Sequence, residues 1–158
     1  MKIVAWVATL VFALDQVTKW AVVHGMSLDT RGLIEIWPPF LTFRMAWNTG
    51  INFGLFSGRE DMTRWVLIAV ALGIVLFVLV WLRRDPPGWK GLVSAGLLIG
   101  GALGNVVDRV LYGAVADFLN MSCCGIQNPY AFNVADIAIF AGAIGLVFWP
   151  ARSGGKTP

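Results

Sequence analysis

Charged side chains are scarce in this sequence. Only 13% of its 158 residues are charged and 58% are hydrophobic, whereas soluble domains carry about 25% charged residues. This deficit disfavours an ordinary soluble domain and predicts a protein whose solvent is the lipid bilayer. The net charge of +3 is spread between apolar segments, which disfavours nucleic-acid binding. In membrane proteins a basic excess instead indicates orientation.

Residue types that serve many catalytic and metal sites are nearly absent. The chain has one histidine, His24, and two adjacent cysteines, Cys123 and Cys124, which form no CxxC pattern. Neighbouring cysteines rarely meet disulfide geometry, so the pair is interpreted as two small loop residues in preference to a redox or metal site. No GxxxxGKS/T or GxGxxG phosphate-binding loop is present. Histidine-based catalysis and nucleotide binding are therefore disfavoured, while a Ser–Lys pair using Lys19 stays open.

Long apolar segments are what the sequence has in abundance. Four could cross a bilayer, at about residues 3–23, 65–82, 91–107 and 133–149. The second has no charged residue and would rise about 27 Å as a helix, close to the thickness of a hydrocarbon core. The first begins like a secretory signal peptide, but no A-x-A-like cleavage site follows, so we expect it to be retained. One integral membrane domain over residues 1–158 is predicted, with a disordered tail at 152–158.

The third of these segments carries glycines at every fourth position. Gly96, Gly100 and Gly104 therefore share one face of the expected helix. Small residues at this spacing let membrane helices approach one another closely. We interpret these glycines as a packing face and not as part of a binding site.

Lysine and arginine positions predict the orientation of the four spans. The basic residues of the N-terminus, of the connection at 83–90 and of the tail fall on one side of a four-span protein. By the positive-inside rule that side is the cytoplasm, and the other two connections face outward. The first outward connection, about residues 30–57, is rich in β-branched and aromatic residues. Its composition is typical of short strands at the membrane surface, with an irregular re-entrant loop as the alternative.

Several polar residues lie within or beside the apolar segments, where charges are costly. Asp15 and Lys19 are four residues apart in the first span, so an ion pair would lower the cost of both. A structural pair and a role near a substrate are both open for them. At the end of the third span, Asn105 and Arg109 share a helix face, and Asp108 lies close by. A helix cap would explain one charged residue there, but it explains three polar residues less comfortably.

Two further acids flank the second outward connection. Asp117 lies just past the third span, and Asp136 lies in the first turn of the fourth. Because this connection starts and ends on one side, both carboxylates are expected at one membrane depth, where they could face each other. Two close carboxylates do not easily both ionise and share a proton. Such a dyad can activate a water and polarise a carbonyl, which is peptide hydrolysis without a metal or a covalent intermediate.

Other interpretations of these acids remain open. Asp136 could serve as a helix cap, although Asn133 is the better N-cap by residue type and leaves Asp136 freer for chemistry. A proton- or ion-coupled carrier is a rival, because intramembrane acids also mark transport pathways. Four spans without evident inverted repeats would make a small carrier that needs to oligomerise. A structural scaffold with buried ion pairs is a third class.

The polar residues also carry a family resemblance. The chain resembles the lipoprotein signal peptidases (signal peptidase II), which are bacterial membrane aspartyl proteases. Four motifs match in order: DQVTK at 15–19, NTGINFG at 48–54, GNVVDRVLYGAVADF at 104–118 and FNVADIAI at 132–139. The resemblance implies a catalytic dyad, polar neighbours that hold substrate or inhibitor, and three supporting residues. These are, respectively, Asp117 and Asp136; Asn48, Asn105, Arg109 and Asn133; and Asp15, Lys19 and Asp108.

The resemblance also implies a fold, a substrate and a location. The implied fold has four transmembrane helices with a small extracytoplasmic β-cradle and a surface helix. The implied substrate is a prolipoprotein whose cysteine carries diacylglyceryl in the membrane lipid, cleaved N-terminal to that cysteine without metal or cofactor; globomycin, a cyclic peptide antibiotic, is the implied inhibitor. Both termini would be cytoplasmic, with the site on the outer, periplasmic face of the bacterial inner membrane. Ile51 and Asn52 stand where the family usually has small residues, mostly alanine.

Overall fold

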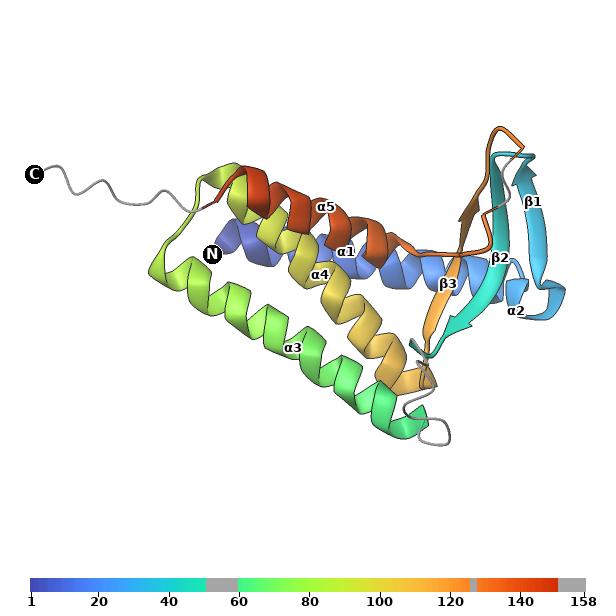
Figure 1. The fold of residues 1–158 in the computed structure, drawn as a ribbon, viewed down its shortest axis with the longest axis horizontal. Helices are drawn as coiled ribbons and strands as arrows, with labels where there is room; N and C mark the ends of the chain where they lie inside the picture. Colours follow the sequence, from blue (N-terminus) through green and yellow to red (C-terminus); the bar gives the residue numbers. More distant parts are fainter. Residues whose placement is uncertain (51–59, 126–127, 151–158) are drawn as a thin grey trace, which may run out of the picture.

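A helical bundle carries a small sheet at one end (Figure 1). The computed structural model describes residues 1–50, 60–125 and 128–150. Its helices are α1 (Lys2–Trp20), the π-helix η1 (Ala21–Gly25), α2 (Leu28–Arg31), α3 (Glu60–Arg84), α4 (Trp89–Tyr112) and α5 (Val134–Phe148). Its strands are β1 (Leu33–Trp37), β2 (Leu41–Asn48) and β3 (Val115–Met121).

The long helices correspond to the predicted apolar segments. Three helical segments are long and apolar enough to cross a membrane, and each contains one predicted span: Lys2–Gly25, Met62–Arg84 and Trp89–Tyr112. The fourth predicted span, 133–149, is the apolar helix α5, whose 15 residues rise about 22 Å. Because a hydrocarbon core is roughly 30 Å thick, length and composition identify three candidate spans in the described part of the chain.

Helix α4 lies at the centre of the bundle and packs against α1, α3 and α5. Its predicted glycine face is the surface that contacts α1. A methyl group added at Gly100 would lie 2.5 Å from the carbonyl oxygen of Ala8, and one at Gly96 would lie 2.6 Å from Cβ of Val7. On the other side, a methyl group at Gly101 would lie 2.5 Å from the carbonyl oxygen of Ala135 in α5. The glycine face therefore permits close contact with α1, as its spacing predicts, and Gly101 permits a second close contact, with α5.

The sheet is antiparallel, with strand order β1-β2-β3. Its first two strands lie in the outward connection at 30–57, where short strands were expected. The sequence pattern did not predict strand β3. The first four residues of β3 are all buried, so the strand lacks the alternation of apolar and polar residues that indicates a half-buried strand. In the sheet register Ala46 of β2 pairs with Asp117 of β3.

A small apolar cluster joins the sheet to the helices. Val22 of η1, Leu28 of α2 and Phe118 of β3 form its buried centre. The ring of Phe118 meets that of Phe43 edge to face, with centroids 5.7 Å apart, an arrangement that ring quadrupoles favour. The cluster fixes β3 against the end of the first helix. Since Asp117 directly precedes Phe118, the same contact helps to fix Asp117.

The expectations for the surface helix, for Ile51 and Asn52 and for the tail stay predictions. Beside the sheet, the described residues form one short helix, α2, of four residues, so the implied surface helix stays a prediction. Ile51 and Asn52 lie outside the described residues, as does the expected disordered tail at 152–158.

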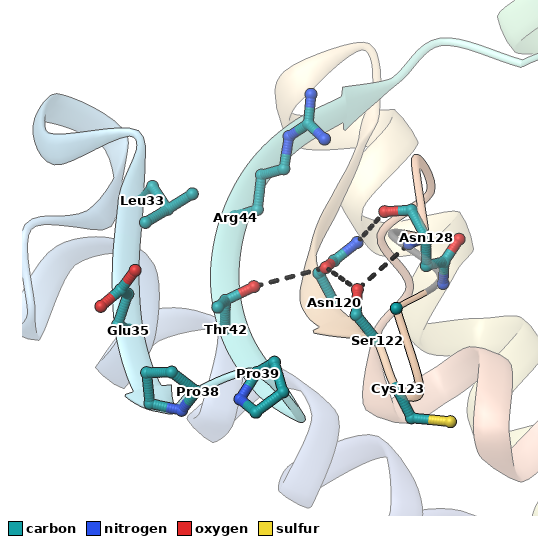
Figure 2. A pocket seen from close by; sticks show the side chains of 11 residues that line it. Leu33, Glu35, Pro38, Pro39, Thr42, Arg44, Asn120, Ser122, Cys123 and Asn128 are labelled. Carbon is teal, nitrogen blue, oxygen red and sulfur yellow. Dashed lines mark hydrogen bonds between the residues drawn. The ribbon is translucent and has the colours of Figure 1, made fainter.

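A cavity of about 410 Å³ lies on the sheet, between the β1–β2 hairpin and the segment after β3 (Figure 2). On one wall the buried Asn120 donates hydrogen bonds to the carbonyl oxygens of Asn128 and Tyr130, at 2.8 and 2.7 Å. These bonds hold the segment that leads towards α5. Cys123 lines the cavity, and both it and Cys124 are exposed, which agrees with their interpretation as loop residues.

Candidate active site

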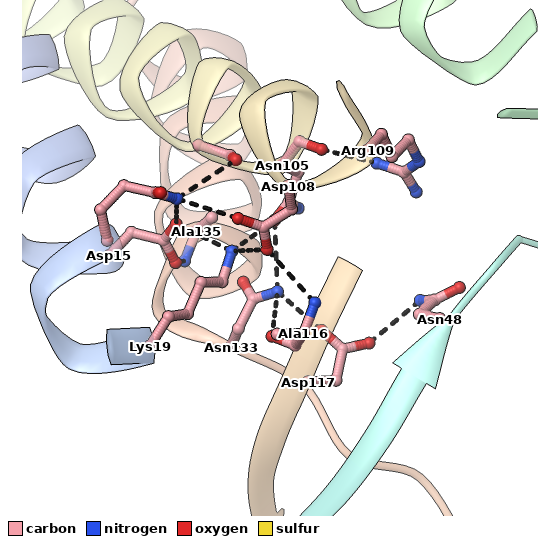
Figure 3. A network of polar contacts seen from close by, with 12 residues as sticks. Asp15, Lys19, Asn48, Asn105, Asp108, Arg109, Ala116, Asp117, Asn133 and Ala135 are labelled. Carbon is pink, nitrogen blue, oxygen red and sulfur yellow. Dashed lines mark hydrogen bonds and ion pairs between the residues drawn. The ribbon is translucent and has the colours of Figure 1, made fainter. Parts of the chain in front are cut away.

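Polar side chains from five elements meet where the bundle joins the sheet (Figure 3). They come from α1, α4, β2, β3 and the N-terminus of α5. Most of these side chains are buried in apolar surroundings. Each buried polar group therefore needs a polar partner. All nine residues named from the sequence lie in this region: Asp15, Lys19, Asn48, Asn105, Asp108, Arg109, Asp117, Asn133 and Asp136.

Asn133 links the two predicted dyad residues. Its side-chain amide donates to Oδ1 of Asp117 at 2.6 Å, and its side-chain oxygen accepts the backbone N–H of Asp136 at 2.8 Å. Its own backbone N–H donates to Oδ2 of Asp136 at 3.2 Å. Asn133 is fully buried, so these contacts are shielded from water. One residue therefore holds both carboxylates, one through its side chain and the other through its backbone.

The contacts of Asn133 confirm one expectation and correct another. Asn133 is the N-cap of α5, as its residue type predicts. However, Asp136 also takes part in capping the helix. Its carboxylate accepts the backbone N–H of the N-cap residue and completes a reciprocal capping box. Only one carboxylate oxygen is used in this way. The other, Oδ1, accepts a hydrogen bond from the side-chain amide of Asn105 at 2.9 Å.

The side chain of Asn105 is oriented by a cation. Its Oδ1 accepts from Nζ of Lys19 at 3.1 Å and from the amide of Asn133 at 3.2 Å. A lysine ammonium can only donate, so the atom of Asn105 that faces Lys19 is its oxygen. The amide nitrogen must then point the other way, towards Asp136. The charge of Lys19 thus sets the direction of a hydrogen bond to a predicted dyad residue.

Lys19 is the centre of a buried ion network. Besides Asn105, its ammonium contacts Oδ2 of Asp15 at 2.8 Å and Oδ2 of Asp108 at 2.7 Å. The three acceptors match its three N–H donors. The ion pair expected between Asp15 and Lys19 is therefore present, and Asp108 on α4 is a second partner that helical spacing does not predict.

The two acids of this network also hold the backbone beside the predicted dyad. Oδ1 of Asp15 accepts the N–H of Ala135 at 2.9 Å, and Oδ2 of Asp108 accepts the N–H of Ala116 at 3.2 Å. Ala135 directly precedes Asp136, and Ala116 directly precedes Asp117. Each acid of the network therefore fixes the chain next to one member of the pair.

Asp117 lies in a setting that favours its neutral form. Its side chain is buried, and burial together with the nearby negative charge of Asp136 raises the pKa of Asp117 to about 6. The amides of Asn48 and Asn133 and the charge of Lys19 act against this rise. The Asn48 amide donates to Oδ2 of Asp117 at 3.0 Å, while its oxygen accepts the N–H of Gly50. Asn48 thus connects the end of β2 to the buried acid.

Arg109 reaches the same region but makes fewer contacts. Its Nη1 donates to the backbone oxygen of Asn105 at 3.3 Å. Its Nε is buried and has no hydrogen-bond partner among the described residues. A buried donor without a partner is costly, so this guanidinium is suited to meet an acceptor from a bound molecule.

Comparison with known proteins identifies the family. The family model described as "Signal peptidase (SPase) II" matches residues 7–151. The chain belongs to the signal peptidase II family. A lipoprotein signal peptidase of Methylorubrum extorquens (strain PA1) is 42% identical, covering 99% of this chain and 88% of the relative. One of Rhodopseudomonas palustris (strain ATCC BAA-98 / CGA009) is 38% identical, covering 94% and 90%.

Solved structures are similar to the signal peptidase II fold described above. Two are described as bacterial membrane enzyme structures determined by the in meso method, at 1.9 and 2.3 Å resolution, and each is 29% identical to this chain. The first has a TM-score of 0.79 and covers 94% of this chain and 92% of its own. The second has a TM-score of 0.77 and covers 94% and 87%.

Sequence reasoning missed one member of this signal peptidase II network. The amide of Gln16 donates to Oδ1 of Asp108 at 3.0 Å and to Oδ2 of Asp15 at 3.2 Å. It therefore bridges the two acids that Lys19 pairs with. The available signal was its position inside DQVTK, next to Asp15. Within the described residues, histidine, cysteine and acidic side chains form no group of three that could hold a metal ion.

The network predicts that Lys19→Met strongly destabilises the protein. The substitution would leave Asp15 and Asp108 buried without a counter-charge, and breaking a buried ion pair in this way costs roughly 3–5 kcal/mol. Thermal unfolding in one detergent should show a clear loss of apparent Tm, with partial recovery when Asp108→Asn is added. Lys2→Met, at an exposed lysine, is the control and should be neutral. An unchanged Tm in Lys19→Met would contradict the network.

Proposed function

We propose that this chain is an aspartic endopeptidase that removes the signal peptide from lipoproteins, with Asp117 and Asp136 as the dyad that activates water. Membership of the signal peptidase II family supports signal-peptide removal. The observation that carries the aspartic mechanism is the position of Asn133 between the two acids. Asn133 makes a hydrogen bond to a carboxylate oxygen of each acid, and the two acids come from different elements.

The raised pKa of Asp117, about 6, supports different roles for the two acids. Asp117 holds the shared proton, and Asp136 is the charged partner. Asp136 removes a proton from a water molecule as the water oxygen attacks the scissile carbonyl carbon, while Asp117 gives its proton to the carbonyl oxygen. The resulting diol then collapses as Asp117 takes back a proton, the C–N bond breaks, and Asp136 protonates the leaving nitrogen. No covalent enzyme intermediate forms.

The surrounding residues are proposed to hold substrate and to fix the dyad. Asn48, Asn105 and Asn133 each donate to a dyad carboxylate. They keep the acids in position, and they are also proposed to contact a bound peptide. Arg109 supplies the buried donor at Nε that lacks a partner in the described structure, and a substrate carbonyl oxygen matches it. The paired charges of Asp15, Lys19 and Asp108 act as support.

The proposed substrate is a prolipoprotein with a diacylglyceryl-modified cysteine, cleaved N-terminal to that cysteine. Its lipid would remain in the surrounding membrane lipid, and globomycin-type inhibitors would compete for the same site. We further propose that α5 is a fourth span, so that residues 1–158 form one multi-pass domain of the bacterial inner membrane with both termini in the cytoplasm. Helix α5 is short by about 8 Å relative to a 30 Å core. That shortness would place Asp136 slightly below the outer, periplasmic surface.

The dyad predicts that Asp117→Asn and Asp136→Asn each reduce cleavage by at least about a thousandfold, because each removes a proton-transfer group. The measurement is cleavage of a diacylglyceryl-modified prolipoprotein by purified protein. Asp29→Asn, at an exposed acid on α2, is the control and should cleave normally. All variants should keep a cooperative unfolding transition. Cleavage at the wild-type rate in either dyad variant would contradict the mechanism, and substrate flux in proteoliposomes without proteolysis would favour a carrier.

The raised pKa of Asp117 predicts the pH dependence. Because Asp117 must carry the proton, kcat/KM should fall as pH rises through about 6, where Asp117 ionises. The hydrogen bond from Asn48 stabilises the charged carboxylate, so Asn48→Ala should raise the pKa of Asp117 and move this alkaline limb to higher pH. Thr42→Ala, on the same strand outside the network, should leave the limb in place. If the alkaline limb of kcat/KM in Asn48→Ala is unchanged or moves to lower pH, its assignment to Asp117 would be contradicted.

A further inference from the structure

A lysine at the opposite end of the helices from the candidate active site lies among aromatic rings. Lys90, in the first turn of α4, places its ammonium 5.2 Å from the ring centre of Trp149 and 5.9 Å from that of Trp89. Both distances fall within the range of cation–π contacts. Among the described residues, no carboxylate lies within salt-bridge distance of this ammonium. Aromatic rings therefore hold the charge, and no described acid neutralises it.

A cavity of about 390 Å³ opens beside this ammonium. Its walls come from the start of α4 and the end of α5, which touch there, because a methyl group at Gly91 would lie 2.7 Å from the carbonyl oxygen of Trp149. Phe148 completes the aromatic lining. Among the described residues that line the cavity, Lys90 is the one that carries a charge. The cavity thus suits a ligand that is negative at one point and apolar around it.

Two further basic residues are close in the sequence to those that line this cavity. Figure 1 shows the start of α4, the end of α5 and the N-terminus at the end of the bundle away from the sheet. Arg83 and Arg84 end α3 and are exposed, and four residues separate Arg84 from the start of α4. Asp85 is the acid in this connection. Basic groups at the end of membrane helices attract anionic lipid headgroups.

An apolar surface extends from the cavity along α5. Phe148, Ile144 and Phe140 are four residues apart and lie on one face of the helix. They are 71%, 42% and 70% exposed within the protein. A membrane helix can expose such a row only to lipid chains or to another apolar surface. The cavity and this row together offer a charged head position followed by a path for a hydrocarbon chain.

We propose that the cavity at Lys90 binds an anionic phospholipid, with the lipid phosphate at the ammonium, the glycerol region against Trp149 and Trp89, and an acyl chain along α5. Charge decides between lipid classes. A zwitterionic headgroup would bring its own cation beside Lys90, where no described acid could receive it. An anionic headgroup brings only negative charge. The proposal needs the chain to lie in a membrane, and it does not depend on the Asp117–Asp136 mechanism.

Native mass spectrometry of the detergent-solubilised protein tests this proposal. The probes are palmitoyl-oleoyl phosphatidylglycerol and palmitoyl-oleoyl phosphatidylethanolamine, which share their acyl chains. The wild-type protein should retain phosphatidylglycerol in preference to phosphatidylethanolamine. Lys90→Gln should lower its retention at least about fivefold, as expected for the loss of one cation at a lipid phosphate. Lys90→Arg should restore the preference, which separates a lost charge from a damaged fold.

Two further variants separate a built site from general attraction. Trp149→Leu keeps every charge but removes a wall of the cavity, so retention of phosphatidylglycerol should fall. Arg31→Gln, which removes an exposed positive charge from α2 beside the sheet, should bind like wild type. Equal retention of the two lipids by wild type would overturn the proposal, and so would wild-type binding in Lys90→Gln. If Trp149→Leu retains phosphatidylglycerol like wild type, diffuse positive charge at the membrane surface explains the binding. That result would overturn the proposed cavity site.

A competition experiment distinguishes a lipid ligand, which has acyl chains, from a free phosphate ester, which has none. If the ligand is a lipid, glycerol 3-phosphate at millimolar concentration should not displace phosphatidylglycerol. Displacement at concentrations matching those of the lipid would show that a free phosphate ester is sufficient, and the lipid assignment would be wrong. Cleavage of lipoprotein substrate by the same variants is a separate readout, so failure of the lipid site and failure of the proposed peptidase activity can be told apart.

Discussion

The buried ammonium of Lys19 is the interaction on which the rest of the candidate active site depends. It holds Asp15 on its own helix and Asp108 on α4, and these acids hold the N–H groups that precede Asp136 and Asp117. It also orients the amide of Asn105. A single cation therefore fixes three groups that surround both members of the proposed dyad. Glycines at the α1–α4 contact let the helices come close enough for this: a methyl group at Gly104 would lie 2.6 Å from Oδ2 of Asp15.

Charge balance explains why the dyad can retain a proton. Among the described residues, the region contains four acids, Asp15, Asp108, Asp117 and Asp136, and two cations, Lys19 and Arg109. Lys19 is committed to the first two acids. If all acids were ionised, a buried site would carry excess negative charge, which a low dielectric makes costly. Protonation of one dyad member reduces that excess, in keeping with the raised pKa of Asp117. The same arrangement that stabilises the fold thus supports acid–base chemistry.

Local signals in the sequence predicted much of this arrangement. Long apolar segments predicted the helices, glycine spacing predicted a packing face on α4, and the residue type of Asn133 predicted the cap of α5. Other features needed the structure. The pair between Lys19 and Asp108 joins two helices, and no helical spacing predicts it. Strand β3 is buried on both faces and has no alternating pattern. The Asn–Asp capping box was missed because the usual pattern has serine or threonine followed by glutamate or glutamine.

The central claim is that the negative charge of Asp136 helps to raise the pKa of Asp117, its partner in the proposed dyad. The most direct test is a pH titration of Asp117 by NMR of ¹³C-labelled aspartate carboxyl groups, in wild type and in Asp136→Asn. The account predicts that Asp117 has a pKa near 6 in wild type. In Asp136→Asn that pKa should fall, because the neighbouring negative charge is gone. An Asp117 pKa that is the same in both proteins would contradict the coupling and, with it, the proposed dyad.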